Sequence, residues 1–563
     1  MPELISVIPR PIVCEPLGGA PFEVTATTAI AVRPTPEEIA LAVLAADLLS
    51  LGSGSAVEIR YTDDGGPGVI ALHLTPDGSP VDDERYTLTV TSARVVIEAS
   101  TRTGLVRGLS TLRQLLRPVG VGPDRRLVAP AVRIEDVPRY RWRGLSVDVA
   151  RHFFDVRELK VLVTLLTRYK LNVLHLHLTD DQGWRLEVPS RPLLTELSGS
   201  SAVGGDPGGF LRTAEYADLV AYATAHGVTV VPEIDIPGHV NAALHAYGEL
   251  SSSGQPTDVY TGTEVGFSRL SAGLPATEAF LRDVLADVAA LTPGGFVHIG
   301  GDEVTRMSAE EYARLVGIAA DAVHAAGKSV VGWQEIASVP LVAGSVVQIW
   351  DHRLDPTDVI AAVRSGARVL LSPGPHAYLD MKYDASTELG LEWAGHIELR
   401  DAYEWEPSTF LDGVPADAVE GVEAAVWTET IRTLDELTAM LLPRLAALAE
   451  VAWSSPERRD WAGYIELRDA YEWEPSTFLD GVPVEAVEGV EAAVWTETIR
   501  TLDELTSMLL PRLAALAEVA WSSPERRDWA DFRARVARHG SVWDRAGLAW
   551  YASPQVDWVR GRA

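Results

Sequence analysis

Between residues 144 and 451, eight short apolar segments alternate with amphipathic helical patterns, and this alternation limits the fold more than any other feature. Such alternation is typical of βα units in a parallel sheet, and eight successive strands close a (β/α)8 barrel. The expected strands are 144–150, 171–180, 228–235, 294–304, 329–336, 345–351, 367–374 and 421–429. The expected helices are 156–168, 213–226, 277–292, 308–327, 357–365 and 434–451.

The pattern of expected strands and helices in residues 1–137 differs from that of the barrel segment. Short β-like runs such as FEVTATTAIAV alternate there with two helical patterns, PEEIALAVLAADLLS and LVRGLSTLRQLLRP. A chain of 563 residues is long enough for two or three domains. We therefore expect a small α+β domain at 1–137, followed by a barrel at 138–460.

The barrel segment ends in a tandem repeat. Residues 393–460 recur almost unchanged at 461–528, with differences only at His396/Tyr464, Ala416/Val484, Asp417/Glu485 and Ala439/Ser507. Stacked repeat proteins use shorter and more numerous units. The pattern indicates a duplication of the last strand and helix of the barrel, and residues 529–563 are expected to form a helical tail that packs on the barrel.

Composition narrows the possible partners and locations. The formal net charge of −31 repels phosphate backbones and anionic lipid, so neither nucleic acid nor a membrane is an expected partner. Cys14 is the only cysteine, which excludes an intramolecular disulfide. The N-terminal residues lack a basic segment followed by an apolar run, so the default expectation is a cytoplasmic location, with secretion left open.

Acidic residues gather at the ends of the expected strands. They are Asp180, Asp235, Asp302, Glu303, Glu335, Asp351 and Glu429. A single acid at such a place is often a helix cap or a solvated loop residue. Seven acids at strand ends instead predict a site at the carboxyl-terminal face of the barrel.

The segment FVHIGGDEV at 296–304 has two glycines followed by adjacent acids, Asp302 and Glu303. The glycines are expected to leave room for a ligand beside the backbone. Neighbouring side chains cannot flank opposite faces of one sugar ring, as the two carboxyls of an ordinary retaining glycosidase do. One acid could therefore transfer protons while the other holds a group beside it. A cap for the helix at 308–327 is an equally weighted alternative.

Several motifs together resemble the family-20 glycoside hydrolases, the β-N-acetylhexosaminidases. They are HIGGDEV, GLSVDVARHFF at 144–154, HLTDDQGWR at 177–185, PEIDIPGHV at 232–240 and a late W-T-E. The resemblance covers nearly the whole chain. It implies an exo-acting enzyme that removes terminal GlcNAc or GalNAc from oligosaccharides or glycoconjugates, with retention. In that family the 2-acetamido group of the substrate is the nucleophile and forms an oxazolinium ion.

The resemblance implies three catalytic residues. Glu303 resembles the general acid/base, Asp302 the acceptor of the acetamido N–H, and Tyr378 the donor to the acetamido oxygen. Together the last two would hold the amide in its attacking geometry.

The resemblance also implies a sugar-binding pocket. The three residues implied for the wall around the acetamido methyl are Trp333, Trp350 and Trp427, for which packing in the barrel wall is the alternative. The residues implied for the sugar hydroxyls and the edge of the site are Arg151, Asp380, Glu429 and Trp393. Asp180 and His239 resemble residues that support the acidic pair, although His239 could be an ordinary loop histidine. We expect no metal and no cofactor, since no metal-ligand spacing and no phosphate-binding glycine loop is present.

A barrel has room for one copy of its last strand, so the site would use either Trp427 and Glu429 or Trp495 and Glu497. The first copy has the shorter connection from the preceding strand, which favours it. The tail at 529–563 directly follows the second copy, which favours that copy instead. We expect the first. The unused copy could then cover the outside of the barrel or pair between chains. An alternative function is a non-catalytic sugar-binding or assembly protein whose barrel the duplication has disturbed; a glycosidase with two separated carboxylates is a weaker one.

Overall fold

The computed structural model describes residues 7–49, 58–62, 66–76, 78, 80, 83–119, 126–459, 510, 529–545, 556 and 558. The chain forms two compact units, one of Ser6–Arg459 and one of Met1–Ile5 with Asp460–Ala563. Apart from residue 510, the second copy at 461–528 lies outside the described residues, and so do Trp495 and Glu497. In the predicted tail the structure describes α18 (Trp529–Val536) and α19 (Gly540–Arg545), and the packing of this tail on the barrel stays a prediction.

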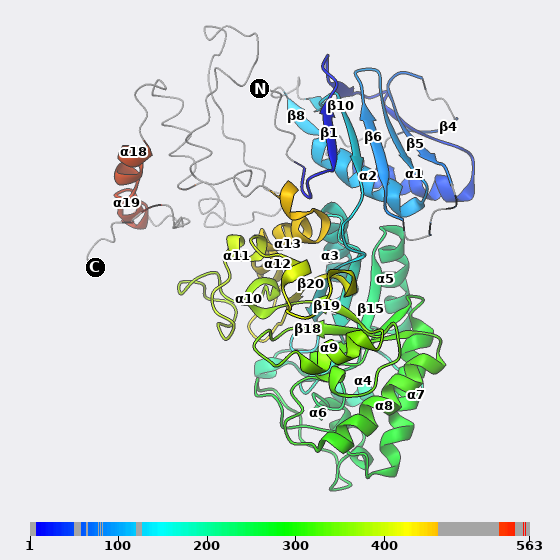
Figure 1. The fold of residues 1–563 in the computed structure, drawn as a ribbon, viewed down its shortest axis with the longest axis vertical. Helices are drawn as coiled ribbons and strands as arrows, with labels where there is room; N and C mark the ends of the chain where they lie inside the picture. The colour runs from blue at the N-terminus through cyan, green and yellow to red at the C-terminus, as the bar shows by residue number, and fades with distance from the viewer. Residues whose placement is uncertain are drawn as a thin grey trace. The chain divides into compact units, whose positions relative to one another are not determined.

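The N-terminal part of the larger unit is an α+β domain, as the sequence predicts. It has a seven-stranded sheet in the order β1-β10-β6-β7-β5-β3-β4 and a three-stranded sheet in the order β2-β9-β8 (blue in Figure 1). Helix α2 packs on β6 and β7 and also contacts α3 of the barrel. The elements are β1 (Val13–Pro16), β2 (Phe22–Val24), β3 (Ala29–Val32), α1 (Pro36–Leu49), β4 (Glu58–Tyr61), β5 (Val69–Leu74), β6 (Tyr86–Val90), β7 (Arg94–Ala99), α2 (Arg102–Leu115), β8 (Arg117–Val119), β9 (Arg126–Ala129) and β10 (Val132–Asp136).

Eight parallel strands then close the predicted barrel, in the order β11-β12-β15-β16-β17-β18-β19-β20 (Figure 1). This confirms the fold class. The strands are β11 (Trp142–Asp148), β12 (Val173–His177), β15 (Thr229–Glu233), β16 (Phe296–His298), β17 (Ser329–Trp333), β18 (Val346–Ile349), β19 (Arg368–Leu371) and β20 (Val419–Val426). A two-stranded hairpin, β13 (Thr179–Asp180) with β14 (Gly183–Trp184), follows β12.

The six helices that the sequence predicts for the barrel begin within two residues of their predicted starts, and α4, α6, α10 and α11 are additional to them. Asp155 caps α3 by accepting from the backbone N–H of Glu158, whose side chain accepts from the N–H of Asp155 in return. The helices are α3 (Val156–Arg168), α4 (Leu193–Ser198), α5 (Thr213–Ala225), α6 (Asn241–Ala246), α7 (Pro275–Leu291), α8 (Ala309–Ala325), α9 (Thr357–Arg364), α10 (Gly374–Ala377), α11 (Leu399–Tyr403), α12 (Leu434–Leu441) and α13 (Arg444–Trp453). No helix in the described part of the chain is long and apolar enough to cross a membrane.

Two expected elements differ most from the structure. The helix expected at 434–451 is split into α12 and α13, because Pro443 lacks an N–H and disfavours helical geometry at the preceding residue. The strand expected at 294–304 is only Phe296–His298. The chain leaves the β region at Gly300 and Gly301, whose φ angles are +67° and +109°. The two adjacent acids therefore lie in the turn after β16 instead of on a strand.

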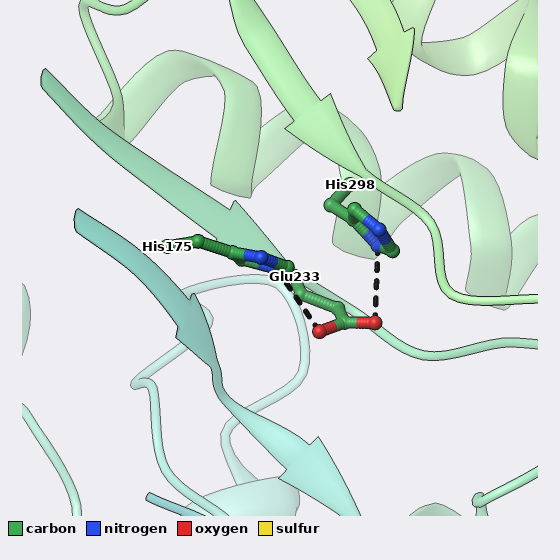
Figure 2. Close-up of side chains that lie close together, drawn as sticks. All are labelled: His175, Glu233 and His298. Carbon is green, nitrogen blue, oxygen red and sulfur yellow. Dashed lines mark ion pairs between the residues drawn. The ribbon is translucent and has the colours of Figure 1, made fainter. Parts of the chain in front are cut away.

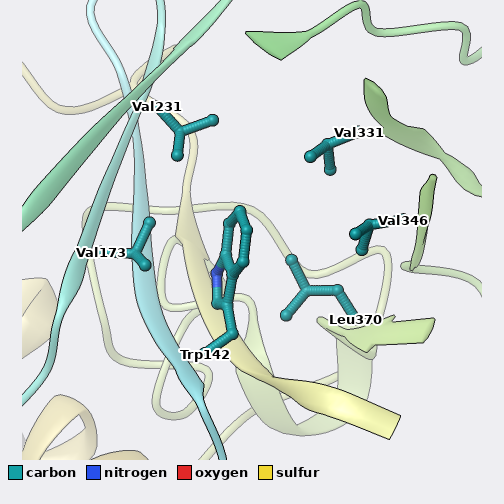
Figure 3. Close-up of a cluster of buried hydrophobic side chains, with 6 residues drawn as sticks. All are labelled: Trp142, Val173, Val231, Val331, Val346 and Leu370. Carbon is teal, nitrogen blue, oxygen red and sulfur yellow. The ribbon is translucent and has the colours of Figure 1, made fainter. Parts of the chain in front are cut away.

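The barrel interior is apolar at its amino-terminal end. The indole of Trp142 is surrounded there by five aliphatic side chains, as Figure 3 shows. The five are Val173, Val231, Val331, Val346 and Leu370. Side chains on one face of a strand recur every second residue, so the next inward position after Val173 is His175, and the next after Val231 is Glu233. The barrel interior is therefore polar between this apolar cluster and the carboxyl-terminal face.

The first copy of the repeat supplies the closing strand. β20 pairs with β19 on one side and with β11 on the other, and Gly421 lies opposite Trp142. A methyl group on Gly421 would lie 1.8 Å from the carbonyl oxygen of Trp142. The helix that follows is also integrated in this unit, because Trp453 Nε1 donates to Asp136 Oδ1 at 3.0 Å.

We predict that Gly421→Ala destabilises the barrel by about 1–3 kcal/mol, because the added methyl forces apart the two strands that close it. The matched control is Gly489→Ala, which makes the same change in the second copy. Thermal unfolding should show a lower midpoint for Gly421→Ala and an unchanged midpoint for Gly489→Ala. The reverse order would mean that the second copy closes the barrel.

Candidate active site

Asp302 and Glu303 lie in the turn between β16 and α8. Asp302 is 9% exposed, while Glu303 is less buried and has a φ of +54°, a conformation that non-glycine residues adopt mainly at functional sites. The helix-capping alternative is wrong, because the cap of α8 is Ser308, whose hydroxyl accepts from the N–H of Glu311. The expected room beside Gly300 is filled, since a methyl group there would lie 1.7 Å from Asp235 Oδ1. The two acids are thus presented by a turn that needs glycine.

His239 connects the two acids with Asp180. Its Nε2 lies 3.5 Å from Glu303 Oε2 and 3.7 Å from Asp302 Oδ2, and its Nδ1 lies 3.2 Å from Asp180 Oδ1. Burial opposes charge on this imidazole, but Asp180 and Asp235 raise its pKa well above the ordinary value. His239 is therefore a buried cation beside the acidic pair, which an ordinary loop histidine would not be.

Asp302 keeps its proton to a higher pH than an exposed aspartate does. Burial is the main cause, His239 opposes it, and Glu303 adds a further upward shift, so that the pKa of Asp302 is raised from 3.8 to about 6. Oδ1 of Asp302 is buried and has no hydrogen-bond partner among the residues that the structure describes. A ligand N–H could bind that oxygen.

Arg151 lies on the other side of Asp180. Its Nη2 is 2.8 Å from Asp180 Oδ2, its Nη1 is 3.5 Å from Asp148 Oδ2, and its guanidinium carbon lies 5.2 Å from the ring centre of Trp427. Burial works against ionisation of Asp180, yet Arg151 and His239 hold the pKa of that carboxyl well below its usual range. Among the described residues, the buried Nε of Arg151 has no hydrogen-bond partner, and Nη1 has only the 3.5 Å ion-pair contact with Asp148, so both nitrogens could donate to a ligand.

All five predicted aromatic residues meet in one chain of ring contacts. The ring centres are 5.9 Å apart for Trp333–Trp427, 6.4 Å for Trp427–Tyr378, 5.4 Å for Tyr378–Trp393 and 5.7 Å for Trp393–Trp350. Trp333, at one end of this chain, is 1% exposed, whereas Trp393, which contacts Trp350 near the other end, is 42% exposed. Rings arranged in this way form a wall that runs from the barrel interior to the surface.

Two carboxylates lie beyond this aromatic wall. Asp380 is 1% exposed, and neither of its carboxylate oxygens has a hydrogen-bond partner of ordinary geometry. Burial and the nearby Glu429 raise its pKa well above the usual range. Burial also raises the pKa of Glu429, against the opposing effect of Arg151. Unpaired buried polar atoms are rare in proteins, and a polyhydroxylated ligand would satisfy them.

The structure adds residues that the sequence did not single out. Asp148 accepts from the backbone N–H of Arg151 at 3.1 Å and from that of Thr428 at 3.1 Å, so it joins the ends of β11 and β20. The only signal for Asp148 was its place at the end of an expected strand. Among the strand-end acids, Glu335 accepts from Trp350 Nε1 at 3.3 Å, and burial together with Asp302 raises its pKa to about 8.

Asp351 is the strand-end acid that stays outside the site. It binds Arg353 in its own loop, with 2.7 Å between Arg353 Nε and Asp351 Oδ1. Asp351 is therefore explained as a loop residue, the alternative given for a single acid at the end of a strand.

Four sets of histidine and carboxylate groups in the described part of the chain have potential metal-binding atoms within 4.8 Å of one another. The sets are His175/Glu233/His298, His177/Glu233/Asp235, Asp180/Asp235/His239 and His239/Asp302/Glu303. Nitrogen and oxygen atoms within these sets contact one another directly, as in His177–Glu233 at 2.8 Å and His175–Glu233 at 3.0 Å. We interpret the sets as ion pairs.

The fold and the site together define a (β/α)8-barrel glycoside hydrolase: an aromatic wall, an arginine and unpaired carboxylates surround an acidic turn at the carboxyl ends of the strands. The model of the catalytic domain of glycosyl hydrolase family 20 matches residues 140–456 and again 454–524, and the model of domain 2 of that family matches residues 4–137. The chain belongs to glycosyl hydrolase family 20.

Individual relatives agree with this assignment. A β-N-acetylhexosaminidase of Cellulomonas fimi is 54% identical over 99% of this chain and 98% of the relative. A β-hexosaminidase of Vibrio furnissii is 34% identical over 79% of this chain and 76% of the relative. The structure of the Streptomyces plicatus N-acetyl-β-hexosaminidase in complex with Thio-NAglucal superposes with a TM-score of 0.76 at 38% identity, covering 98% of this chain and 97% of that one.

The raised pKa of Asp302 predicts a pH-dependent stability. The folded state binds this proton more tightly than the unfolded chain, so the free energy of unfolding falls as pH rises from about 4 to about 6. Asp302→Asn removes this dependence. Its free energy of unfolding should therefore rise relative to that of the wild type by up to about 3 kcal/mol as the pH rises through that window. Thermal midpoints measured against pH test this, with the exposed Glu310→Gln as a control that should follow the wild type. Parallel curves for Asp302→Asn and the wild type would contradict it.

Proposed function

We propose that this protein is an exo-acting β-N-acetylhexosaminidase that hydrolyses terminal, non-reducing GlcNAc or GalNAc with retention. The observation that carries the proposal is the pair of adjacent acids on one turn, next to a cationic histidine and an aromatic wall. Two carboxyls so close together cannot flank a sugar ring as acid and nucleophile, which fits the family-20 mechanism, in which the 2-acetamido group of the substrate is the nucleophile. The membership of family 20 and the names of the relatives support the same activity.

Glu303 is the proposed general acid/base. It is the more exposed of the two acids and can reach a leaving group, while Asp302 lies deeper. Glu303 protonates the departing glycosidic oxygen and later removes a proton from the attacking water. His239, 3.5 Å from Glu303 Oε2, stabilises the carboxylate that forms when the proton leaves.

Asp302 and Tyr378 are the proposed partners of the acetamido group. The unpaired Oδ1 of Asp302 accepts its N–H and stabilises the positive charge of the oxazolinium ion, and the Tyr378 hydroxyl donates to its oxygen. Burial, with Asp380 and Asp302 nearby, raises the pKa of Tyr378 well above 10, so the hydroxyl keeps its proton. Fixing both ends of the amide turns the attack into an oriented intramolecular step.

The remaining residues are proposed to bind the sugar. Trp350 and Trp427 enclose the acetamido methyl above the buried Trp333, and Trp393 covers the open side. Arg151 donates to the 3- and 4-hydroxyls through Nε and Nη1, while Asp380 and Glu429 accept from the 4- and 6-hydroxyls. Asp180 orients Arg151 and His239 at the same time.

The first copy of the repeat is proposed to complete the site, because β20 closes the barrel and leads directly to Trp427 and Glu429. The alternative of a disturbed, non-catalytic barrel loses its basis when one copy closes the barrel. A cytoplasmic location and an oligomer formed through the second copy stay predictions, which cell fractionation and light scattering would test.

We predict that the wild type releases nitrophenol from p-nitrophenyl N-acetyl-β-glucosaminide at least about a thousandfold faster than from the plain β-glucoside, which lacks the internal nucleophile. Glu303→Gln should lower kcat by about 100- to 10,000-fold. Initial rates measured with both substrates, for the wild type and for Glu303→Gln, test both expectations. Equal turnover of the two sugars, or a glycosyl ester trapped on an aspartate or glutamate, would contradict the mechanism.

The duplicated residues provide a second, internally controlled prediction. Glu429→Gln should lower kcat/KM by about 10- to 100-fold, because a charge-assisted hydrogen bond to the sugar is lost. Glu497→Gln, the same change in the second copy, should leave kcat/KM within twofold of the wild type. A loss in Glu497→Gln with full activity in Glu429→Gln would assign the site to the second copy.

A further inference from the structure

Glu233, the last residue of β15, is fully buried and lies among four nitrogen-bearing side chains from three other strands. Figure 2 shows His175 and His298 approaching its two carboxylate oxygens from different strands, both at 3.0 Å. His177 Nδ1 lies 2.8 Å from Glu233 Oε2, and Trp333 Nε1 donates to Glu233 Oε1 at 2.8 Å. Each oxygen of this one carboxylate therefore has two close partners.

Three of these partners lead to three different parts of the active site. His177 Nε2 lies 2.9 Å from Asp180 Oδ2, and Asp180 in turn binds Arg151 and His239. Trp333 is the base of the aromatic wall, with its ring centre 5.9 Å from that of Trp427.

The third partner, His298, reaches the acidic turn. Its Nδ1, the atom that lies 3.0 Å from Glu233 Oε1, also lies 3.0 Å from the backbone nitrogen of Gly300, and this one ring nitrogen either accepts from the N–H of Gly300 or donates to the carboxylate. Gly300 begins the turn that carries Asp302 and Glu303. The glutamate therefore has a separate link to the sugar hydroxyl side, to the acetamido pocket and to the catalytic turn.

The histidines around Glu233 favour the ionised form of this buried carboxyl. Burial opposes its ionisation, but His298, His177 and His175 hold the pKa of the carboxyl well below its usual range. Burial lowers the pKa of His298 itself, so His177 and His175 are the cationic partners. Burial likewise opposes charge on His175 and His177, yet adjacent carboxylates raise the pKa of His175 to about 9 and that of His177 well above 6.5. A carboxylate between two imidazolium ions can stay ionised in a protein interior, where an isolated charge could not.

We propose that Glu233 is a positioning residue of the active site, which fixes His177, Trp333 and His298 together and through them the groups that face the substrate. This deepens the proposed function and depends on it. Glu233 has no exposed surface and is not a catalytic residue. Its effect is on the alignment of residues that bind the transition state, so it should appear in kcat more than in KM.

The test is Glu233→Gln, which keeps the shape of the side chain and removes the charge. The amide NH2 cannot face the indole N–H of Trp333, so it has to face His177 and His175, which then lose their charge or move. We expect kcat on the N-acetylglucosaminide to fall at least about thirtyfold, with KM changed less than about threefold.

The matched control is Glu423→Gln in the same barrel interior. Glu423 is equally buried and accepts from Trp142 Nε1 at 2.6 Å and Gln348 Nε2 at 2.9 Å, and it lies 2.8 Å from His175 Nδ1. It lacks the contacts to His177, Trp333 and His298, so Glu423→Gln should lower the thermal midpoint but keep kcat within about threefold. Equal losses of kcat in both variants would reduce Glu233 to a structural residue and overturn the proposal, as would full activity in Glu233→Gln.

Two further measurements keep the outcome decisive. If Glu233→Gln does not fold, His298→Phe removes in a similar volume both the contact with Glu233 Oε1 and the link to Gly300. It should lower kcat while KM is retained, and full activity there overturns the proposal. Elemental analysis of the purified wild type tests the other use of this cluster: a stoichiometric metal, with activity lost on chelation and restored on reloading, would replace positioning by metal binding. An inactive wild type would instead refute the proposed function itself.

Discussion

The pairing of β11 with β20 is the contact on which the rest of the barrel and the site depend. It joins strands about 280 positions apart, from Trp142 opposite Gly421 to Val147 opposite Val426. Parallel neighbours in register end at the same level, so the residues after them meet. Asp148 then binds the backbone of both Arg151 and Thr428, which places the arginine beside Trp427. Without this closure the sugar-binding side of the site would not assemble.

A second constraint is the burial of many ionisable groups above an apolar floor. Carboxylates and imidazoles alternate along Glu233, His177, Asp180, His239 and the acidic pair, with contacts of 2.8–3.7 Å. Each charge has an opposite neighbour, which offsets the cost of removing it from water. Asp302 lies at the end of this series beside Glu303, and burial with a like charge nearby raises its pKa to about 6. The chemistry of the turn thus depends on charges inside the barrel.

Much of this architecture could be predicted from the sequence. The period of apolar residues indicated eight strands and their helices, and the adjacent acids after two glycines marked the acidic turn. The break at Pro443 was missed because the apolar period continues through it, although proline interrupts the helix. Glu233 and Asp148 were not singled out, because their importance lies in partners from other strands. No local pattern encodes those contacts.

The sequence by itself determined the fold class, the adjacency of Asp302 and Glu303 and the set of aromatic residues, since periodicity, glycine positions and residue types are local properties. The tertiary structure alone decided that β20 of the first copy closes the barrel, because two nearly identical segments have the same local preferences. It also decided the charge states of the buried acids and histidines. Those follow from distances between strands far apart in the chain, which only the closed barrel brings together.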